Sequence, residues 1–381
     1  MVDINRVIEK ILVERLVPNK VNLIFGTRRV GKTFLLKKII ANTSFRILML
    51  QGEDIDTQQL LVHKSIANYE RILQNIDLLV IDEAQVIPEI GKILKLIIDN
   101  ISGIRVIVTG SSAFDLANVS GEPLTGRAYF HELFPISQGE LMEQENALQT
   151  LQNLEERMIY GAYPELWNLP FSVSKAEYLK DLLNTYLLKD IIAYEGIKNS
   201  SKIRDLLRLI AFQIGKEVSL DELAKQLQMS RNTVEKYLDL CSKVFILKKI
   251  EAFSGNLRKE ISKSSRWYFW DLGVRNALIN DFRPMALRND KGELWENYLV
   301  SERLKFLKYS KSLTETYFWR TYDQQEVDWL EHENGQLRAF EFKFKDGKAK
   351  VPTAFAKTYV EATFSVINQE NYLQFITGET L

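Results

Sequence analysis

The feature that most constrains this chain is a glycine-bounded loop near its start. The loop reads Gly26-Thr27-Arg28-Arg29-Val30-Gly31-Lys32-Thr33. Residues 21–25 before it are largely apolar and partly β-branched, as in a buried strand, and the apolar residues after it recur at helical spacing. A strand, a tight loop and a helix in this order are typical of open α/β sheets, which bind ligands at the carboxyl ends of their strands.

The loop matches G-x-x-x-x-G-K-[ST] at every fixed position and therefore predicts a phosphate site. Backbone N–H groups of the loop and of the helix start can point at phosphates, where the helix dipole favours negative charge. Lys32 supplies a mobile positive charge, and the Thr33 hydroxyl suits a magnesium ion. A glycine turn with a solvated lysine is the plainer alternative. We predict ATP and Mg2+ as cofactors, bound by Gly26, Thr27, Arg28, Arg29, Val30, Gly31, Lys32, Thr33 and Phe34.

Acidic and hydroxyl side chains follow the next apolar runs. Residues 78–81 predict a buried strand that ends on Asp82 and Glu83. Asp82 can hold magnesium through water and Glu83 can polarise an attacking water, although such a pair often only caps the next helix. Ser111 follows the apolar run 106–108, within reach of a γ-phosphate, and turn formation would also explain it. Glu83 and Ser111 are therefore predicted catalytic residues, and Asp82 is a predicted metal ligand.

Fully apolar strands that alternate with helices indicate a parallel sheet covered on both faces. The chain resembles AAA-type ATPases of the additional-strand class, and more narrowly a bacterial and archaeal family whose phosphate loop reads G-x-R-R-x-G-K-T. The matching stretches are residues 26–33, 80–85, 109–112, 124–127, 133–137 and 160–164. Ala162 departs mildly from the Gly-Gly that this family often has. The resemblance implies a role for Arg127 as an arginine finger or sensor, acting across a subunit interface; a solvated surface arginine is the alternative.

Residues 217–250 predict a compact second module. Ser219 begins a helix with Glu222 three residues on, a capping box, and residues 228–230 turn into a second helix. The exposed residues expected on that second helix are Arg231, Asn232, Thr233, Glu235 and Lys236. Residues 244–250 are expected to form a β wing. The module resembles a winged helix-turn-helix, whose second helix enters the major groove in DNA readers; a packing module between larger domains is the alternative.

Acidic residues gather again in the C-terminal third. Asp328 lies in an apolar strand, and after a turn Glu341 and Lys343 project from one face of a second strand. If the two strands pair, two carboxylates and a lysine converge, and Glu296 on a preceding helix can add a third carboxylate. Such a group can bind magnesium and stabilise a phosphodiester transition state. We predict catalytic roles for all four residues, with Asp328 and Glu341 as metal ligands. Cross-strand charge pairs on a solvated face are the alternative.

The same C-terminal third resembles the accessory domain that is paired with this ATPase family, of the DUF4143 type. The matching order is G-x-L-x-E-N-x-V, then E-V-D-x, then E-x-K. The core of this domain is similar to the PD-(D/E)xK nuclease fold. Many domains of that fold cleave nothing, so the resemblance implies the architecture and leaves cleavage open.

Charge and composition limit the partners. Lys plus Arg and Asp plus Glu are each 50, so the whole chain is not drawn electrostatically to nucleic acid, although local basic surfaces remain open. The single cysteine, Cys241, cannot form an internal disulfide, which favours a reducing, cytoplasmic setting. No apolar run reaches the roughly 18 residues of a membrane span, so we expect no membrane partner.

The sequence as a whole predicts an α/β protein. A P-loop parallel sheet comes first and a helical lid second; a winged helix-turn-helix and a C-terminal α/β restriction-endonuclease-like domain follow. The predicted ranges are 1–136, 137–215, 216–258 and 259–381. The leading interpretation is an ATP-hydrolysing ATPase coupled to a DNA-binding or nuclease-like half. The alternative is an ATP-dependent switch that binds a protein partner without cleaving DNA; assembly with further copies of the chain stays open.

Overall fold

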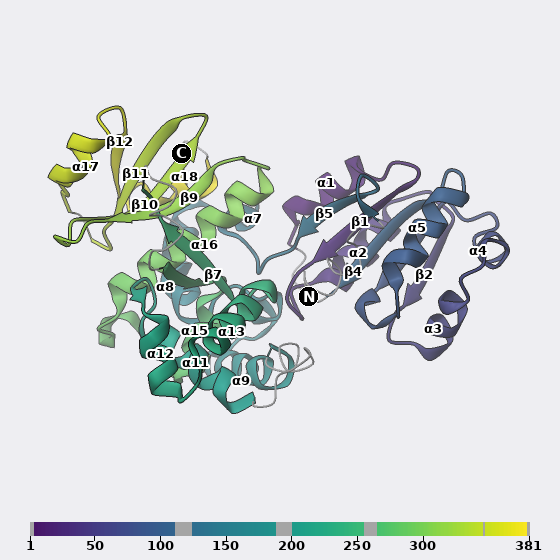
Figure 1. Cartoon of the computed structure of the whole chain (residues 1–381), viewed down its shortest axis with the longest axis horizontal. Helices are drawn as coiled ribbons and strands as arrows, with labels where there is room; N and C mark the ends of the chain where they lie inside the picture. Colours follow the sequence, from purple (N-terminus) through teal and green to yellow (C-terminus); the bar gives the residue numbers. More distant parts are fainter. Residues whose placement is uncertain (1–3, 111–123, 188–199, 255–264, 346, 379–381) are drawn as a thin grey trace. The chain divides into compact units, whose positions relative to one another are not determined.

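The computed structural model describes residues 4–110, 124–187, 200–254, 265–345 and 347–378 (Figure 1). The chain divides into two compact units. The first unit spans Asp3–Phe134 and takes in Lys243–Phe245, and the second unit spans Pro135–Ser242 and Ile246–Leu381. No helix in these described ranges is both long and apolar enough to cross a membrane.

The first unit is built on a five-stranded parallel sheet with the order β2-β3-β4-β1-β5 (Figure 1). Its strands are β1 (Lys20–Phe25), β2 (Ile47–Gln51), β3 (Leu78–Asp82), β4 (Arg105–Gly110) and β5 (Ala128–Glu132). Its helices are α1 (Val7–Glu14), α2 (Lys32–Ala41), α3 (Ile55–Val62), α4 (Ile66–Ile72) and α5 (Ile90–Asn100), with the 3-10 turn η1 (Ala84–Val86). The predicted strands and the predicted parallel sheet are confirmed, and β5 is a strand that the sequence patterns did not indicate.

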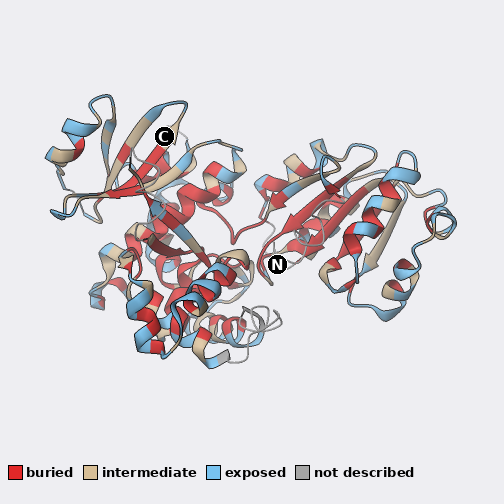
Figure 2. Cartoon of the chain, viewed as in Figure 1, coloured by how far each residue is buried: buried red, intermediate tan, exposed pale blue. Residues whose placement is uncertain are grey.

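The three central strands explain why the predicted apolar runs are continuous. Almost every residue of β1, β3 and β4 is buried, whereas β2 at the edge is mostly intermediate (Figure 2). Strands buried on both faces require unbroken apolar sequence. The register pairs Ile24 with Thr109 and Ile81 with Val108, so the carboxyl ends of these three strands meet at one edge of the sheet. The phosphate loop therefore starts beside Asp82 and Thr109.

The second unit combines helices with a mixed seven-stranded sheet. Its helices are α7 (Gln138–Leu141), α8 (Ala147–Tyr160), α9 (Ser172–Leu182), α11 (Ser200–Phe212), α12 (Leu220–Leu227), α13 (Arg231–Lys243), α15 (Leu272–Ile279), α16 (Lys291–Tyr309), α17 (Thr353–Thr358) and α18 (Tyr372–Thr377), with short turns η2 (Pro164–Asn168), η3 (Leu183–Leu187) and η4 (Met285–Leu287). Its strands are β6 (Glu217–Val218), β7 (Leu247–Ala252), β8 (Ser265–Phe269), β9 (Glu315–Arg320), β10 (Glu326–Glu333), β11 (Gln336–Phe342) and β12 (Thr363–Ile367).

This sheet joins segments that the sequence assigned to separate modules. Its order is β12-β11-β10-β9-β7-β8-β6, and β7 pairs with β8 on one side and with β9 on the other. The predicted ranges 137–215 and 259–381 therefore lie within one compact unit, as does the range 216–258 apart from Lys243–Phe245. The boundaries between these ranges remain predictions. The strand expected to begin at residue 244 begins at Leu247 instead, because Phe245 has a φ of +59° and lies in a turn.

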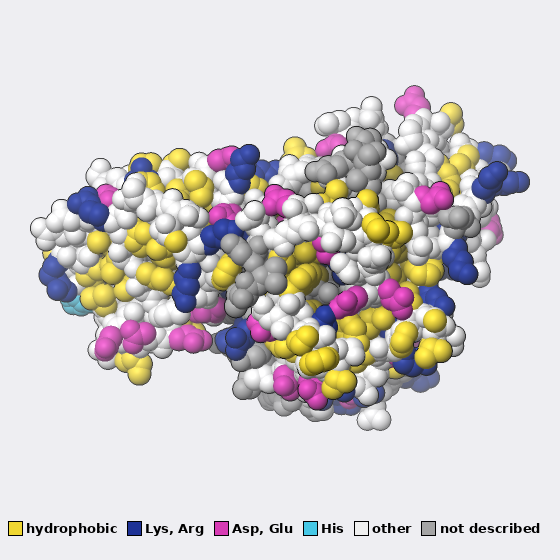
Figure 3. Space-filling model, turned by 180° about the vertical axis from the view of Figure 1, so that it is seen from behind, with side chains coloured by type: hydrophobic (Ala, Val, Ile, Leu, Met, Phe, Trp, Pro, Cys, Tyr) yellow, Lys and Arg dark blue, Asp and Glu magenta, His cyan; other side chains and the backbone are white. Residues whose placement is uncertain are grey.

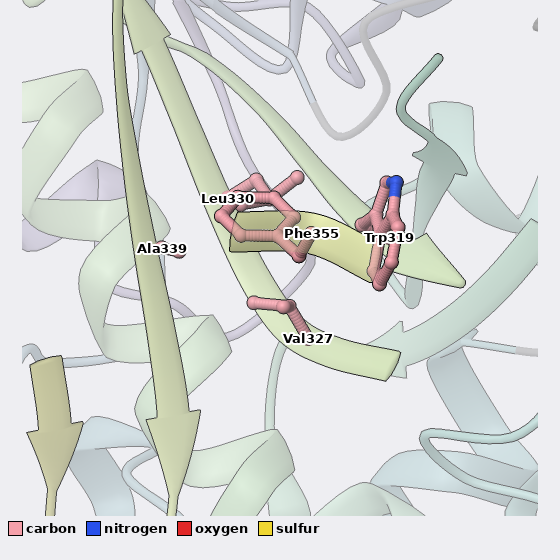
Figure 4. Close-up of a cluster of buried hydrophobic side chains, with 5 residues drawn as sticks. All are labelled: Trp319, Val327, Leu330, Ala339 and Phe355. Carbon is pink, nitrogen blue, oxygen red and sulfur yellow. The ribbon is translucent and has the colours of Figure 1, made fainter. Parts of the chain in front are cut away.

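A compact apolar cluster anchors the hairpin β10–β11. It comprises Trp319, Val327, Leu330, Ala339 and Phe355 (Figure 4). The rings of Trp319 and Phe355 meet edge to face with their centroids 5.1 Å apart, which fixes α17 against β9. A register shift between Val327 and Leu330 lets both side chains reach the same cluster. The strands that carry Asp328 and Glu341 therefore rest on a rigid support.

Candidate functional site

The phosphate loop is held in a shape that only glycine permits at two positions. Gly31 has a φ of +102° and caps the start of α2, in a backbone region that side chains disfavour. A Cβ at Gly26 would collide with the carbonyl oxygen of Leu133, whose N–H bonds Phe25 O at 2.7 Å. The sequence therefore places glycine where the loop turns into the helix and where the backbone after β5 passes close to it.

Lys32 is the buried cation of the loop. Only 4% of its surface is exposed, and its Nζ donates to the carbonyl oxygens of Gly26 and Thr27, each at 3.0 Å. It also lies 3.8 Å from Glu83 Oε1. The ammonium group is thus held across the loop, in the position from which a phosphate-loop lysine can reach β- and γ-phosphates.

Asp82 is the best-organised acid in the first unit. It is fully buried, and its two carboxylate oxygens accept hydrogen bonds from different elements. Thr33 Oγ1 donates to Oδ2 at 2.6 Å, and Thr109 Oγ1 donates to Oδ1. A carboxylate and a hydroxyl side by side form the hard oxygen set that Mg2+ prefers. The two residues predicted to share the metal are therefore in contact and fit the ion chemically.

Glu83 follows Asp82 in a strained backbone conformation. Its φ of 52° and ψ of 46° lie in the left-handed region, which costs a non-glycine residue roughly 1 kcal/mol or more. Its N–H donates to Thr109 Oγ1 at 3.0 Å, and a Cβ at Gly52 would collide with its carbonyl oxygen. Its side chain accepts from Gln85 Nε2 at 2.7 Å. Backbone and carboxylate are both fixed beside Lys32, as a water-polarising residue requires.

The remaining predicted loop residues differ in their surroundings. Val30 is fully buried, and its carbonyl accepts from the Arg6 guanidinium at 3.0 Å. Arg28 forms a loose, solvent-exposed ion pair with Glu53 at 3.9 Å. Of the other three, Thr27 is buried, Arg29 has a φ of +65° and Phe34 is 38% exposed.

Two predicted catalytic residues of the first unit are not part of this group. Ser111 lies outside the described residues. Arg127 precedes β5, where its carbonyl accepts from Val21 N at 3.0 Å, at the end of the sheet opposite to the phosphate loop. Its side chain is exposed and pairs with Asp99 at 2.8 Å. Within its own unit Arg127 is therefore remote from Lys32, and a finger role would require another copy of the chain.

The C-terminal acids converge in the second unit. A pocket of about 560 Å³ is lined by Glu296 of α16, Asp328 of β10 and Glu341 of β11, together with Lys343. Asp328 Oδ2 accepts from Phe342 N at 2.9 Å, and Lys343 Nζ donates to Glu341 Oε1 at 2.8 Å. The hairpin pairing therefore brings all four predicted residues to one place.

Arg266 of β8 occupies the middle of these acids. Its side chain is 4% exposed and contacts Glu296 at 3.4 Å, Glu326 at 2.9 Å and Asp328 at 3.9 Å. Its guanidinium also lies 4.6 Å from the centre of the Phe318 ring. In the described part of the chain, no three acidic, His or Cys side chains are arranged to hold a metal ion. Of the two acids predicted as metal ligands in this pocket, Asp328 therefore lies beside a fixed internal cation, and Glu341 is paired with Lys343.

Burial makes Glu296 and Asp328 weaker acids than an exposed carboxyl group. Burial, reinforced by the charge of Asp328, raises the pKa of Glu296 to about 8. Burial and the nearby Glu341 raise the pKa of Asp328 to about 6. Burial opposes the charge of Arg266, but the surrounding groups outweigh it, so the pKa of this guanidinium is raised. At neutral pH, Glu296 is then largely protonated, and its Oε1 still accepts from the Tyr268 hydroxyl at 2.6 Å.

Three models of known domains match separate segments of the chain. Residues 18–142 match the sequence model described as an AAA domain. Residues 151–284 and 291–379 match two models described as domains of unknown function, DUF8612 and DUF4143. The first unit, with its loop and acidic strand end, is thus a P-loop ATPase domain of the AAA type.

Similar proteins cover most of the chain. An uncharacterized protein of Mycobacterium tuberculosis is 25% identical over 326 residues, which span 84% of this chain and 69% of that protein. An uncharacterized protein of Methanocaldococcus jannaschii is 25% identical over 351 residues, spanning 85% and 75%. Among solved structures, the Walker-type ATPase of Pyrococcus abyssi covers 73% of this chain and 96% of its own, with 15% identity and a TM-score of 0.50. This likeness concerns the fold.

Sequence reasoning missed several residues of both sites. Arg266 and Tyr268 alternate on one face of an aromatic strand, a period-of-two signal that could have marked them as inward-facing polar groups. Gln85 follows the predicted acid pair by two residues, but nothing in its spacing indicates that it turns back. Arg6 lies far along the sequence from the residues it contacts, so no local pattern could have found it.

Proposed function

We propose that the first unit hydrolyses ATP with Mg2+ and that its nucleotide state alters the second unit. The observation that carries the first half is the contact of Thr33 and Thr109 with the buried Asp82. In this proposal Lys32 binds the β- and γ-phosphates, and Thr33 and Asp82 hold the magnesium ion, which neutralises phosphate charge when bound. Glu83 accepts a hydrogen bond from the attacking water and orients it toward the γ-phosphorus.

Arg6 supports the coupling. Its two terminal nitrogens donate to Val30 O of the phosphate loop at 3.0 Å and to Phe134 O at 2.6 Å, and the side chain is buried. Phe134 is the last residue of the first unit before the chain enters the second at Pro135. Leu133 is also packed against Gly26. A shift of the loop when phosphates bind would thus act directly on the connecting segment.

The element order of the second unit supports a winged helix-turn-helix module. It runs α11, β6, α12, α13, β7 and β8, with β6 and β7 flanking β8 in the sheet. Four exposed charged residues of α13 give no net charge: Arg231, Glu235, Lys236 and Asp239. Arg231 is moreover paired with Asp221 at 3.1 Å. In Figure 3, Lys and Arg side chains are interspersed with acidic ones over the visible face. DNA phosphates favour clustered cations, so we propose a protein partner.

The acid pocket supports a non-cleaving role for the second unit. A phosphodiester-cleaving magnesium site needs carboxylates available to the metal. Here Arg266 already contacts Glu296, Glu326 and Asp328. DNA cleavage is the second candidate function, favoured by the convergence of Glu341 and Lys343 on the same pocket. Plasmid nicking with Mg2+ or Mn2+ that Asp328→Ala abolishes and Lys32→Ala retains would establish it.

Intrinsic fluorescence tests the coupling, because all six tryptophans lie in the second unit. ATP binding to the first unit should change their emission, and Lys32→Ala should abolish both binding and the change. Arg6→Ala should bind a fluorescent ATP analogue with affinity within about threefold of wild type yet lose most of the emission change. Arg15→Ala, at the opposite end of α1 from Arg6 and stacked on Tyr129, is the control. Wild-type emission that ATP leaves unchanged, despite binding, would refute the coupling.

A further inference from the structure

The carboxylate of Glu83 has two neighbours, and a bound nucleotide would attract one of them. Its Oε1 lies 3.8 Å from Lys32 Nζ, and its Oε2 accepts from Gln85 Nε2 at 2.7 Å. The charge of Lys32 is what a bound β- or γ-phosphate attracts. When ATP draws Lys32 toward its phosphates, Gln85 is the partner that still restrains the Glu83 carboxylate within the described structure.

Gln85 is placed for this task by its own short turn. It lies in η1 directly after the fully buried Ala84, and Ile87, which follows the turn, is almost fully buried and donates its N–H to Ala84 O at 3.0 Å. Buried residues at the two ends of the turn hold it against the core, so the Gln85 side chain starts from a defined backbone position. It reaches back two residues along the chain rather than outward.

The orientation of the Gln85 amide follows from the chemistry of its partner. A carboxylate only accepts hydrogen bonds, so the NH2 group and not the carbonyl oxygen must face Glu83. The Oε1 atom on the other side is buried and has no hydrogen-bond partner within the described ranges. A buried acceptor without a partner is unfavourable. The stability of the fold therefore does not by itself explain a glutamine at this position, whereas its contact with Glu83 does.

We infer that Gln85 is a positioning residue for ATP hydrolysis, which keeps the Glu83 carboxylate aimed at the attacking water after Lys32 has turned to the phosphates. This inference rests on the proposed function, because Gln85 acts only through Glu83. Gln85 touches neither nucleotide nor metal in this role. It should consequently govern turnover and leave nucleotide binding alone.

Steady-state hydrolysis and a double-mutant cycle test the inference on the full chain. Gln85→Leu keeps the approximate volume and removes the donor, so kcat should fall about 10- to 100-fold while KM stays within about twofold. Gln85→Glu puts a second acid beside Glu83 and should lower kcat at least as far. Gln59→Leu, on the exposed side of α3, is the matched control and should hydrolyse ATP like the wild type.

The background of Glu83→Gln separates positioning from a structural role. In that background Gln85→Leu should cause no further loss beyond about twofold, because the group through which Gln85 acts is gone. A second, multiplicative loss, or a weakened affinity for a fluorescent ATP analogue, would overturn the inference. So would a Gln85→Leu enzyme that turns over at the wild-type rate. A wild-type chain that binds ATP without hydrolysing it would instead refute the proposed function together with the inference.

Discussion

The two groups of acids in this chain look alike in sequence but have different neighbours in the fold. Asp82 and Glu83 follow an apolar strand and meet hydroxyl groups and a lysine that phosphates can attract. Asp328 and Glu296 also lie on buried elements, but their cationic neighbour is Arg266, whose side chain is itself buried. We therefore propose that the same residue type serves ligand binding in one unit and internal charge balance in the other. The identity of the cation opposite decides which.

The largest expected effect separates the two groups by activity. Lys32→Ala should abolish ATP hydrolysis and weaken ATP binding by about 100-fold or more, because the phosphates lose their main point charge. Asp328→Ala should leave kcat for ATP within about twofold. Phosphate release and equilibrium binding measure both. Undiminished ATP affinity in Lys32→Ala would contradict the assignment of the phosphate loop.

The next effect tests whether Arg266 is the counter-ion of the second unit. Arg266→Met removes one partner of a buried charge group and should lower the free energy of unfolding by about 3–5 kcal/mol. Denaturant unfolding followed by tryptophan emission reports on the second unit. Lys249→Met, on the neighbouring strand in an exposed pair with Glu251, should cost no more than about 0.5 kcal/mol. Equal costs for the two variants would contradict the contrast with the first unit.

The most gradual effect is a pH dependence of the free energy of unfolding. The pKa of Glu296 in the folded chain is about 8, against its ordinary 4.5, so between these values the folded state binds a proton that the unfolded state lacks. Stability should therefore fall as pH rises, by about 1.4 kcal/mol per pH unit at most from about pH 5 to 8. Glu296→Gln removes this dependence. The free energy of unfolding of the variant should therefore rise relative to that of the wild type as the pH increases from about 5 to 8. Parallel pH curves for the two proteins would show that Glu296 titrates normally.

The sequence predicted the first unit well because its signals are local. The glycine loop directly follows one apolar strand and the acid pair directly follows another, and parallel sheets place the carboxyl ends of such strands together by rule. Strand β5 was missed because its residues Ala128–Glu132 are only half buried at the sheet edge and show no continuous apolar run.

The second unit was predicted less completely because its pairings are distant. The hairpin β10–β11 and its acids could be derived from alternation and a short turn. The rest of the sheet depends on contacts between segments far apart in the chain, namely the pairing of β7 with β9 and of β6 with β8. The position of Arg266 against the acids follows from that pairing, and no spacing rule within one strand contains it. The site predicted from the sequence did not include Arg266 and contained only the carboxylates and Lys343.

The buried Arg266 also restricts how this pocket can change over generations. A lineage that lost the arginine first would leave Glu326 and Asp328 without their buried counter-ion, and one that lost both of these acids first would leave a buried cation without a partner. Either single step passes through a less stable protein. Replacing the whole group therefore requires nearly simultaneous substitutions. We expect related proteins either to keep the arginine together with its acids or to lack both.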